Sequence, residues 1–323
     1  MSDPPPLVLL HEDDDIVAVQ KPSGEPVIPA RDGSAQDCVQ RRLERQLGRR
    51  LWVVHRIDKD ASGVVVFARN ADAHRALSLA FEHRQVSKAY TAFVAGSIEP
   101  SRGRLNVPLH PARKGKTRPA RPGEPGAQAA TTEYAAQKRW TLPASPSSRA
   151  RTGGDEPRET DNDSRDKGSA VPADPSGLVH SESLLMNVLP RGLPDGQCIR
   201  HDRRPGEGHL PRATRAPRGS GLGMTSIVSL LEAHPHTGRH HQIRVHLRSA
   251  GTPILFDPLY GRGLMPETLA GAPCARLALH ARRIDLPAPR GEGRVVVEAP
   301  LSADLAALAE WLDACGHGEP VGA

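Results

Sequence analysis

Apolar residues follow two kinds of spacing along the first 140 residues, and the two alternate. Short apolar runs at 7–10 and 16–19 flank an acidic turn and predict a hairpin, whereas residues 36–47 have the spacing of an amphipathic helix. Asn70 precedes the helical pattern of 72–84 and is predicted to cap that helix. Further strands are predicted at 52–54, 64–68, 88–95 and 131–140.

The pattern is lost between residues 142 and 223, which are rich in Pro, Gly, Ser, Arg and Asp and show almost no apolar periodicity. A compact domain rarely contains a structureless loop of this length, so residues 141–223 are predicted to be a disordered, low-complexity insertion. The mixed charges of this segment nearly cancel, which favours a solvated spacer. Its arginines could instead form a basic RNA tether: Arg200, Arg203, Arg204, Arg212, Arg215 and Arg218.

Periodic patterns return after the insertion. They predict a strand at 225–233, a helix at 239–249, strands at 275–284 and 294–298, and a last helix at 303–315. Neither flank carries enough elements to complete a domain alone. We therefore predict that residues 1–140 and 224–323 are the N-terminal and C-terminal halves of one catalytic domain.

Composition narrows the class of protein only a little. The chain has 30 glycines and 31 prolines, which agrees with a segment that does not fold. A net charge of +6 suits a polyanionic partner such as nucleic acid, although many soluble proteins are equally basic. The four cysteines lie far apart, and no apolar run is long enough to cross a membrane. We expect a soluble, cytoplasmic protein with reduced thiols and no leader peptide.

The segment 55–63, HRIDKDASG, places Asp58 between two apolar strands on a short loop with Arg56 and Lys59. A carboxylate among cations stays ionised and can act as a nucleophile or a general base. The loop could equally be an ordinary charged turn. DKDAS also fits the pattern of magnesium-dependent aspartate-nucleophile phosphatases, but those sites place apolar residues where this chain has His55 and Arg56.

A second polar cluster follows at 237–247, TGRHHQIRVHL. Gly238 predicts a tight turn, and a helix from residue 239 would place His240, Arg244 and Arg248 on one face, four residues apart. Such a basic face suits phosphate or carboxylate binding. Several histidines lie nearby, but no carboxylate or cysteine completes a zinc pattern, so no metal is expected.

Six motifs in order carry a resemblance that covers nearly all of the chain outside the insertion and the extreme termini. They are KPSG at 21–24, HRIDKDASG at 55–63, SKAYTAFVAG at 87–96, TGRHHQIRVHL at 237–247, DPLYG at 257–261 and LALHA at 277–281. Together they resemble the RluA-type pseudouridine synthase family. The chain departs from the family pattern at Ile57, Ala61, His240 and Phe256.

The resemblance implies a fold and a reaction. The fold is of the α+β type, a mixed and largely antiparallel sheet flanked by helices. The reaction detaches the uracil of an RNA uridine, turns it and rejoins it through carbon 5, which needs neither a cofactor nor a metal. The implied substrate is rRNA or tRNA, bound by a monomer without the separate N-terminal RNA-binding module of some relatives. A relative that binds RNA but is catalytically inactive is the alternative.

The resemblance also implies roles for individual residues. Asp58 matches the catalytic aspartate, Tyr90 the tyrosine that stacks on the target base and exchanges protons, and Arg244 the basic partner of the aspartate. Arg56 matches an arginine that fills the gap left by the extruded uridine. Without the motifs, Tyr90 could be a core residue and Arg244 a surface cation. The other implied substrate-binding residues are His55, Gly238, Arg239, Gln242 and Leu279.

Overall fold

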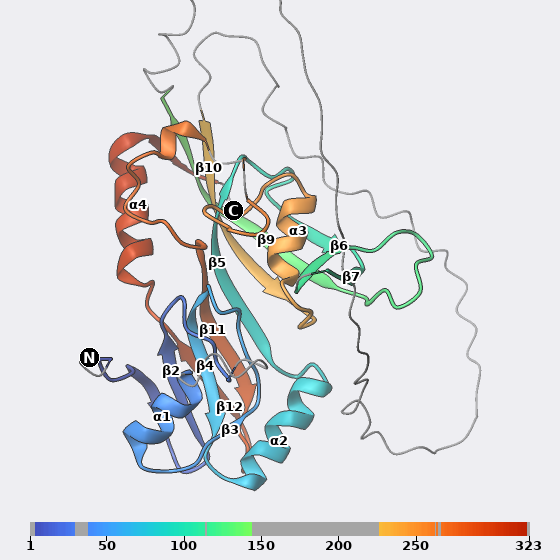
Figure 1. Ribbon diagram of the computed structural model, residues 1–323, viewed down its shortest axis with the longest axis vertical. Helices are drawn as coiled ribbons and strands as arrows, with labels where there is room; N and C mark the ends of the chain where they lie inside the picture. The colour runs from blue at the N-terminus through green and yellow to red at the C-terminus, as the bar shows by residue number, and fades with distance from the viewer. Residues whose placement is uncertain are drawn as a thin grey trace, which may run out of the picture. The chain divides into compact units, whose positions relative to one another are not determined.

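The computed structural model describes residues 4–29, 38–113, 115–143, 226–261, 263 and 266–321, and they build a large mixed sheet with helices on its faces (Figure 1). The helices are α1 (Val39–Leu47), α2 (Ala71–Glu82), α3 (Gln242–Ser249), α4 (Ala303–Cys315) and the short 3-10 helix η2 (Glu267–Leu269). The strands are β1 (Leu9–Glu12), β2 (Ile16–Lys21), β3 (Trp52–Val53), β4 (Ser62–Ala68), β5 (Ser87–Ala95), β6 (Arg102–Asn106), β7 (Leu109–Ala112), β8 (Lys116–Pro119), β9 (Thr131–Leu142), β10 (Ser226–Pro235), β11 (Leu279–Pro287), β12 (Arg294–Glu298) and β13 (His317–Pro320).

Eleven of the described strands form one sheet with the order β1-β2-β4-β11-β5-β10-β9-β13, while β3, β6 and β12 pair at its margins and β7 pairs with β8 separately. The C-terminal strand β11 lies between the N-terminal strands β4 and β5, so both ends of the chain contribute to the centre. All pairings are antiparallel except β4 with β11. The predicted mixed, largely antiparallel sheet is therefore confirmed.

The parallel contact between β4 and β11 requires a glycine. Gly63 has a φ of +117°, and a Cβ atom at this position would lie 2.2 Å from the carbonyl oxygen of Ala281. Only a residue without a side chain allows the two backbones to approach so closely. Because Gly63 ends the HRIDKDASG segment, this contact fixes where the preceding loop leaves the sheet.

Strand β4 is buried on both faces, and its alternation assigns one helix to each. Val65 and Phe67 pack with Val39 and Leu43 of α1. On the other face, Val64 and Val66 share a cluster with α2, which begins after Asn70. The Asn70 side chain accepts a hydrogen bond from the N–H of Ala73, as its predicted capping role requires. A third, larger cluster packs α4 and α3 against β5, β9 and β10.

Several predicted elements differ from the structure. The helix expected from residue 239 begins only at Gln242, because His241 has a left-handed φ of 55°. His240 therefore precedes the helix and does not share a helical face with Arg244 and Arg248. The strand expected at 275–284 begins at Leu279, and four short strands, β6, β7, β8 and β13, were not predicted.

Strands from both sides of the proposed insertion pair directly. Strands β9 and β10 are antiparallel neighbours from Thr132 opposite Pro235 to Leu142 opposite Ser226. The intervening residues 144–225 lie outside the described residues, so the boundaries and the disorder proposed for 141–223 remain predictions.

Candidate active site

A cavity of about 510 Å³ lies between the loop of Asp58, the start of β5 and the segment that leads from β10 into α3. All nine residues that the sequence suggested line this cavity: His55, Arg56, Asp58, Tyr90, Gly238, Arg239, Gln242, Arg244 and Leu279. Five of them belong to segments more than 140 residues away from the other four. The fold thus brings the predicted residues together, while their roles stay predictions.

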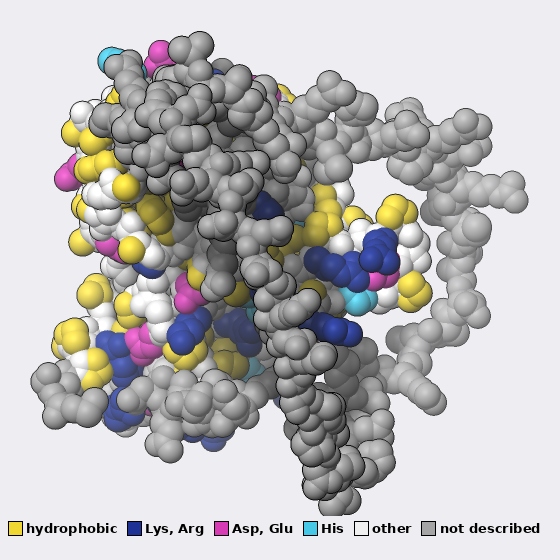
Figure 2. Space-filling model, turned by 45° about the horizontal axis from the view of Figure 1, so that its top comes forward, with side chains coloured by type: hydrophobic (Ala, Val, Ile, Leu, Met, Phe, Trp, Pro, Cys, Tyr) yellow, Lys and Arg dark blue, Asp and Glu magenta, His cyan; other side chains and the backbone are white. Residues whose placement is uncertain are grey.

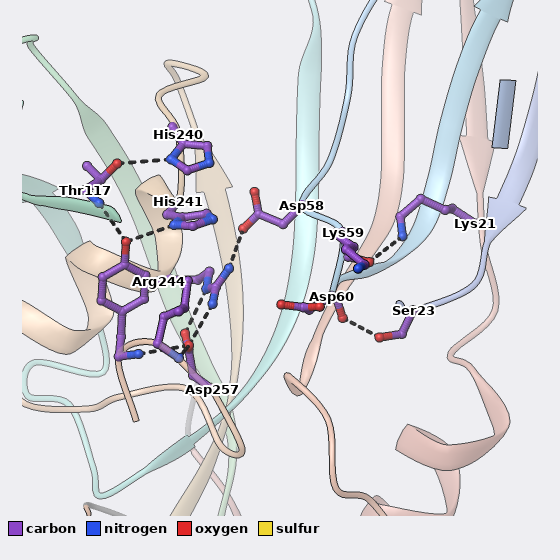
Figure 3. A network of polar contacts seen from close by, with 12 residues as sticks. Lys21, Ser23, Asp58, Lys59, Asp60, Thr117, His240, His241, Arg244 and Asp257 are labelled. Carbon is purple, nitrogen blue, oxygen red and sulfur yellow. Dashed lines mark hydrogen bonds and ion pairs between the residues drawn. The ribbon is translucent and has the colours of Figure 1, made fainter. Parts of the chain in front are cut away.

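The loop that carries Asp58 is held by the KPSG turn. The ammonium of Lys21, fully buried, donates to three backbone carbonyls, those of Pro22 at 2.7 Å, Glu25 at 2.6 Å and Lys59 at 2.8 Å. Figure 3 shows the hydrogen bond to Lys59. Ser23 adds a hydrogen bond from its hydroxyl to the carbonyl of Asp60. The backbone on the C-terminal side of Asp58 is therefore anchored, and the aspartate side chain projects on the side of the loop that faces α3.

Arg244 connects Asp58 to a second carboxylate. Its guanidinium is 1% exposed and donates two hydrogen bonds to Asp257, from Nε at 2.8 Å and from Nη2 at 2.7 Å. The remaining nitrogen, Nη1, lies 3.3 Å from Asp58 Oδ2 (Figure 3). Burial alone would raise the pKa of Asp257, but the hydrogen bonds and charge of Arg244 outweigh it and lower that pKa. Asp257 thus fixes the orientation in which Arg244 reaches Asp58.

Tyr90 lies on β5 and is half-buried beside the cavity. Burial, and then the negative charge of Asp58, raise the pKa of its hydroxyl well above the usual value. The side chain is therefore a neutral phenol that offers both an apolar ring and a proton donor to whatever occupies the cavity.

Two residues predicted to bind substrate use their polar atoms inside the protein. Nε2 of His55 accepts a hydrogen bond from the N–H of Val66 at 3.0 Å, and the ring stacks on Phe81. Burial, and then the nearby charge of Lys88, lower the pKa of His55 to about 3, so the ring is neutral. Gln242 accepts hydrogen bonds from Thr237 and Arg239 and donates to Thr131 and Thr132. Both residues shape the cavity wall.

A chain of polar and aromatic contacts continues beyond Arg244 (Figure 3). The guanidinium lies over the Tyr260 ring at 5.2 Å, and the Tyr260 hydroxyl lies 2.9 Å from Nδ1 of His241. His240 stacks on His241 with ring centres 3.7 Å apart and contacts Thr117. Burial lowers the pKa of His241 to about 4. Tyr260 therefore links Arg244 to the histidine pair that precedes α3.

Two residues of the site were not identified from the sequence, Asp257, which holds Arg244, and Lys88, which lines the cavity. Asp257 belongs to the DPLYG motif, but nothing in its spacing indicates that it pairs with Arg244. Lys88 also lines the cavity. Its position two residues before Tyr90 on the same strand was a usable signal, because side chains at i and i+2 share one face of a strand.

The structure also bears on the other kinds of site that were considered. Asp60, the second aspartate of the phosphatase-like pattern, does not line the cavity. Among the described residues, no group of three or more His, Cys, Asp or Glu side chains is arranged to hold a metal ion. Within the same residues, no helix is long and apolar enough to span a bilayer.

Comparisons with known proteins identify the family. The family model described as RNA pseudouridylate synthase matches residues 15–249. The ribosomal large subunit pseudouridine synthase D of Nitrosomonas europaea is 25% identical over 97% of this chain and 67% of its own length. The dual-specificity RNA pseudouridine synthase RluA of Vibrio vulnificus is 41% identical over 101 residues, which are 31% of this chain and 40% of the relative.

A solved structure supports the same assignment at the level of the fold. The human RNA pseudouridylate synthase domain containing 1 superposes with a TM-score of 0.58 over 100% of this chain and 94% of its own, at 18% identity. The phosphatase alternative finds no support in these comparisons, since the family model covers both halves of the cavity. The chain therefore belongs to the RluA-type RNA pseudouridine synthase family, isomerases that convert uridine in RNA to pseudouridine.

Proposed function

We propose that Asp58 is the carboxylate that attacks or deprotonates the target uridine. The observation that carries this proposal is the contact of Asp58 with Arg244, a buried guanidinium that Asp257 holds in place. The contact from Arg244 Nη1 to Asp58 Oδ2, 3.3 Å long, can hold the carboxylate in position at the cavity wall. The other carboxylate on the cavity lining, Glu82, is exposed at the end of α2 and has no such partner among the described residues.

The reaction exchanges one bond for another within the same nucleotide. The bond from ribose C1′ to N1 of uracil breaks, a bond from C1′ to C5 forms, the proton on C5 leaves, and N1 gains a proton. The freed base must stay in place while it turns. The ring of Tyr90 offers a stacking surface for it, and the neutral hydroxyl can exchange a proton near the base.

Arg56 has a different task in this proposal. Its side chain is exposed at the cavity mouth. Extruding a uridine from a stacked RNA loop costs a few kcal/mol, and a side chain that fills the vacated space recovers part of that cost. Figure 2 shows further Lys and Arg side chains gathered on the described surface, where they can attract the phosphate backbone.

The proposed substrate is a uridine in ribosomal or transfer RNA. The name of the Nitrosomonas europaea relative assigns it to the large ribosomal subunit, which supports the ribosomal alternative. We further propose that the enzyme works in the cytoplasm as a monomer, and that residues 1–140 and 224–323 form one catalytic domain. The direct pairing of β9 with β10 supports the last point.

The decisive experiment maps pseudouridine in cellular rRNA and tRNA from a strain without this protein and after complementation. Wild-type protein should restore the missing modification, and Asp58→Asn should not. Asp60→Asn is the matched control, because Asp60 lies on the same loop but outside the cavity lining, and it should restore the modification. Restoration at normal rate by Asp58→Asn would refute the catalytic assignment.

A further inference from the structure

One cation on the cavity wall, Lys88, has no acidic partner among the described residues. Lys88 lies on β5 two residues before Tyr90, so both side chains emerge on the same face of the strand, and both line the cavity. Lys88 is half-buried. Among the described residues, no carboxylate or hydrogen-bond acceptor contacts its ammonium, whereas the nearby Arg244 contacts two carboxylates.

The surroundings of the Lys88 ammonium leave room for a ligand. A Cβ atom placed on Gly238 would lie 4.0 Å from Lys88 Nζ, so the ammonium stands over a residue that contributes no side chain. Its other neighbour on the wall, His55, is neutral. Burial lowers the pKa of Lys88, and no opposite charge among the described residues offsets this effect. An unpaired, partly desolvated charge costs stability, so it is expected to serve a ligand.

We propose that Lys88 binds a backbone phosphate next to the uridine that is held over Asp58. This inference rests on the proposed function, because it takes the cavity above Asp58 as the place of the target nucleotide. A nucleotide that swings out of an RNA loop carries its flanking phosphates toward the cavity. Two residues along a strand span about 7 Å, a separation comparable with that between a base on Tyr90 and a phosphate of the same nucleotide.

The first test uses small ligands that the enzyme does not convert. Binding of uridine and of uridine 3′,5′-bisphosphate is measured by NMR titration with wild-type protein and with Lys88→Met. For wild type, we expect the bisphosphate to bind about tenfold more tightly than uridine, since one charge-assisted contact to phosphate is gained. In Lys88→Met this preference should fall below about threefold. An equal preference in both proteins overturns the proposal. Parallel titrations with uridine 3′-monophosphate and uridine 5′-monophosphate identify which of the two phosphates Lys88 binds.

The second test uses RNA. If nucleotides bind too weakly for the titration, this test by itself decides whether Lys88 binds a phosphate. Pseudouridine formation is followed on total RNA from cells that lack this protein, at increasing salt. Loss of one phosphate contact should lower kcat/KM and flatten the dependence of log kcat/KM on log salt by about 0.7–1. Lys88→Arg should retain most of the wild-type slope. Lys88→Met with wild-type rates at every salt concentration overturns the proposal.

Thermal unfolding separates ligand binding from a structural role. Lys88→Met removes an uncompensated charge, so it should unfold at the same temperature as wild type or higher, in spite of its weaker binding. A lower unfolding temperature would assign Lys88 a structural role. Lys138→Met is the matched control, because Lys138 lies on β9 outside the cavity lining and pairs with Asp313 of α4. This variant should leave the phosphate preference unchanged. Failure of Asp58 as the catalyst would not affect these nucleotide titrations.

Discussion

The two carboxylates that contact Arg244 should respond to substitution in opposite ways. Asp257 accepts two hydrogen bonds from the guanidinium and two more from the N–H groups of Leu259 and Tyr260, at 2.9 and 3.0 Å. Asp58 makes a single contact with Arg244 at 3.3 Å, and its side chain is 21% exposed. We predict that Asp257→Ala damages the fold, whereas Asp58→Ala damages the reaction.

The expected magnitudes follow from burial. In Asp257→Ala, the guanidinium of Arg244, 1% exposed, keeps the long contact with Asp58 as its one carboxylate partner among the described residues. Removing one partner of a buried ion pair costs about 3–5 kcal/mol. For a domain of this size, that loss lowers the unfolding temperature by roughly 6–20 °C. In Asp58→Ala, Arg244 remains paired with Asp257, and the loss should be no more than about 1 kcal/mol.

Urea unfolding followed by circular dichroism measures both variants, and pseudouridine formation is assayed in parallel. Glu298→Ala is the control, because Glu298 is 55% exposed and pairs with Arg283 at 3.5 Å. This surface pair should contribute at most about 1 kcal/mol. The reasoning is refuted if Asp257→Ala unfolds within 1 kcal/mol of wild type, or if Asp58→Ala is destabilised as strongly as Asp257→Ala.

Three further predictions concern the scaffold. His55 is neutral in the fold, with a pKa of about 3, so the folded state loses stability as the pH falls below the pKa of His55 in the unfolded chain, about 6.5. Between pH 7 and 5, the free energy of unfolding of His55→Phe in urea titrations should therefore fall by about 2 kcal/mol less than that of wild type. An equal fall in both proteins would contradict this. Gly63→Ala should lower the free energy of unfolding by more than about 3 kcal/mol, because the added Cβ would collide with Ala281. Gly291→Ala should lower it by about 1 kcal/mol, because a Cβ at that position meets no atom within 4 Å. Replacing residues 144–224 by a four-residue loop containing Asn-Gly should preserve folding and pseudouridine formation, because Leu142 and Ser226 already pair; a folded but inactive product would assign these residues a role in the reaction.

The fold could be predicted where a strong local pattern agrees with the final packing. Strand β4 is apolar on both faces and is buried on both, and Asn70 caps α2 as its position indicates. Strands such as β6 and β13 have mostly exposed side chains, so they lack the alternation that identifies a half-buried strand. They exist because the long strand β9 offers backbone partners to both.

The start of α3 shows a different limit. Residues 239–249 have a continuous helical pattern, yet the helix begins at Gln242 because His241 is left-handed. The contact of His241 with Tyr260, 19 residues away, accompanies this conformation. A local pattern contains no information about such a distant partner, so the expected face shared by His240 and Arg244 was wrong.

The candidate site could be predicted for the residues that carry the chemistry but not for the charges that balance them. Asp58, Tyr90 and Arg244 each belong to a long motif, whereas the partners of a cation depend on the tertiary approach of other segments. Arg244 has two carboxylates and Lys88 has none within the described residues. The two cations line one cavity, yet their removal should have opposite consequences. Arg244→Met strands the buried Asp257 and lowers stability, while Lys88→Met removes an uncompensated charge and lowers only the affinity for RNA.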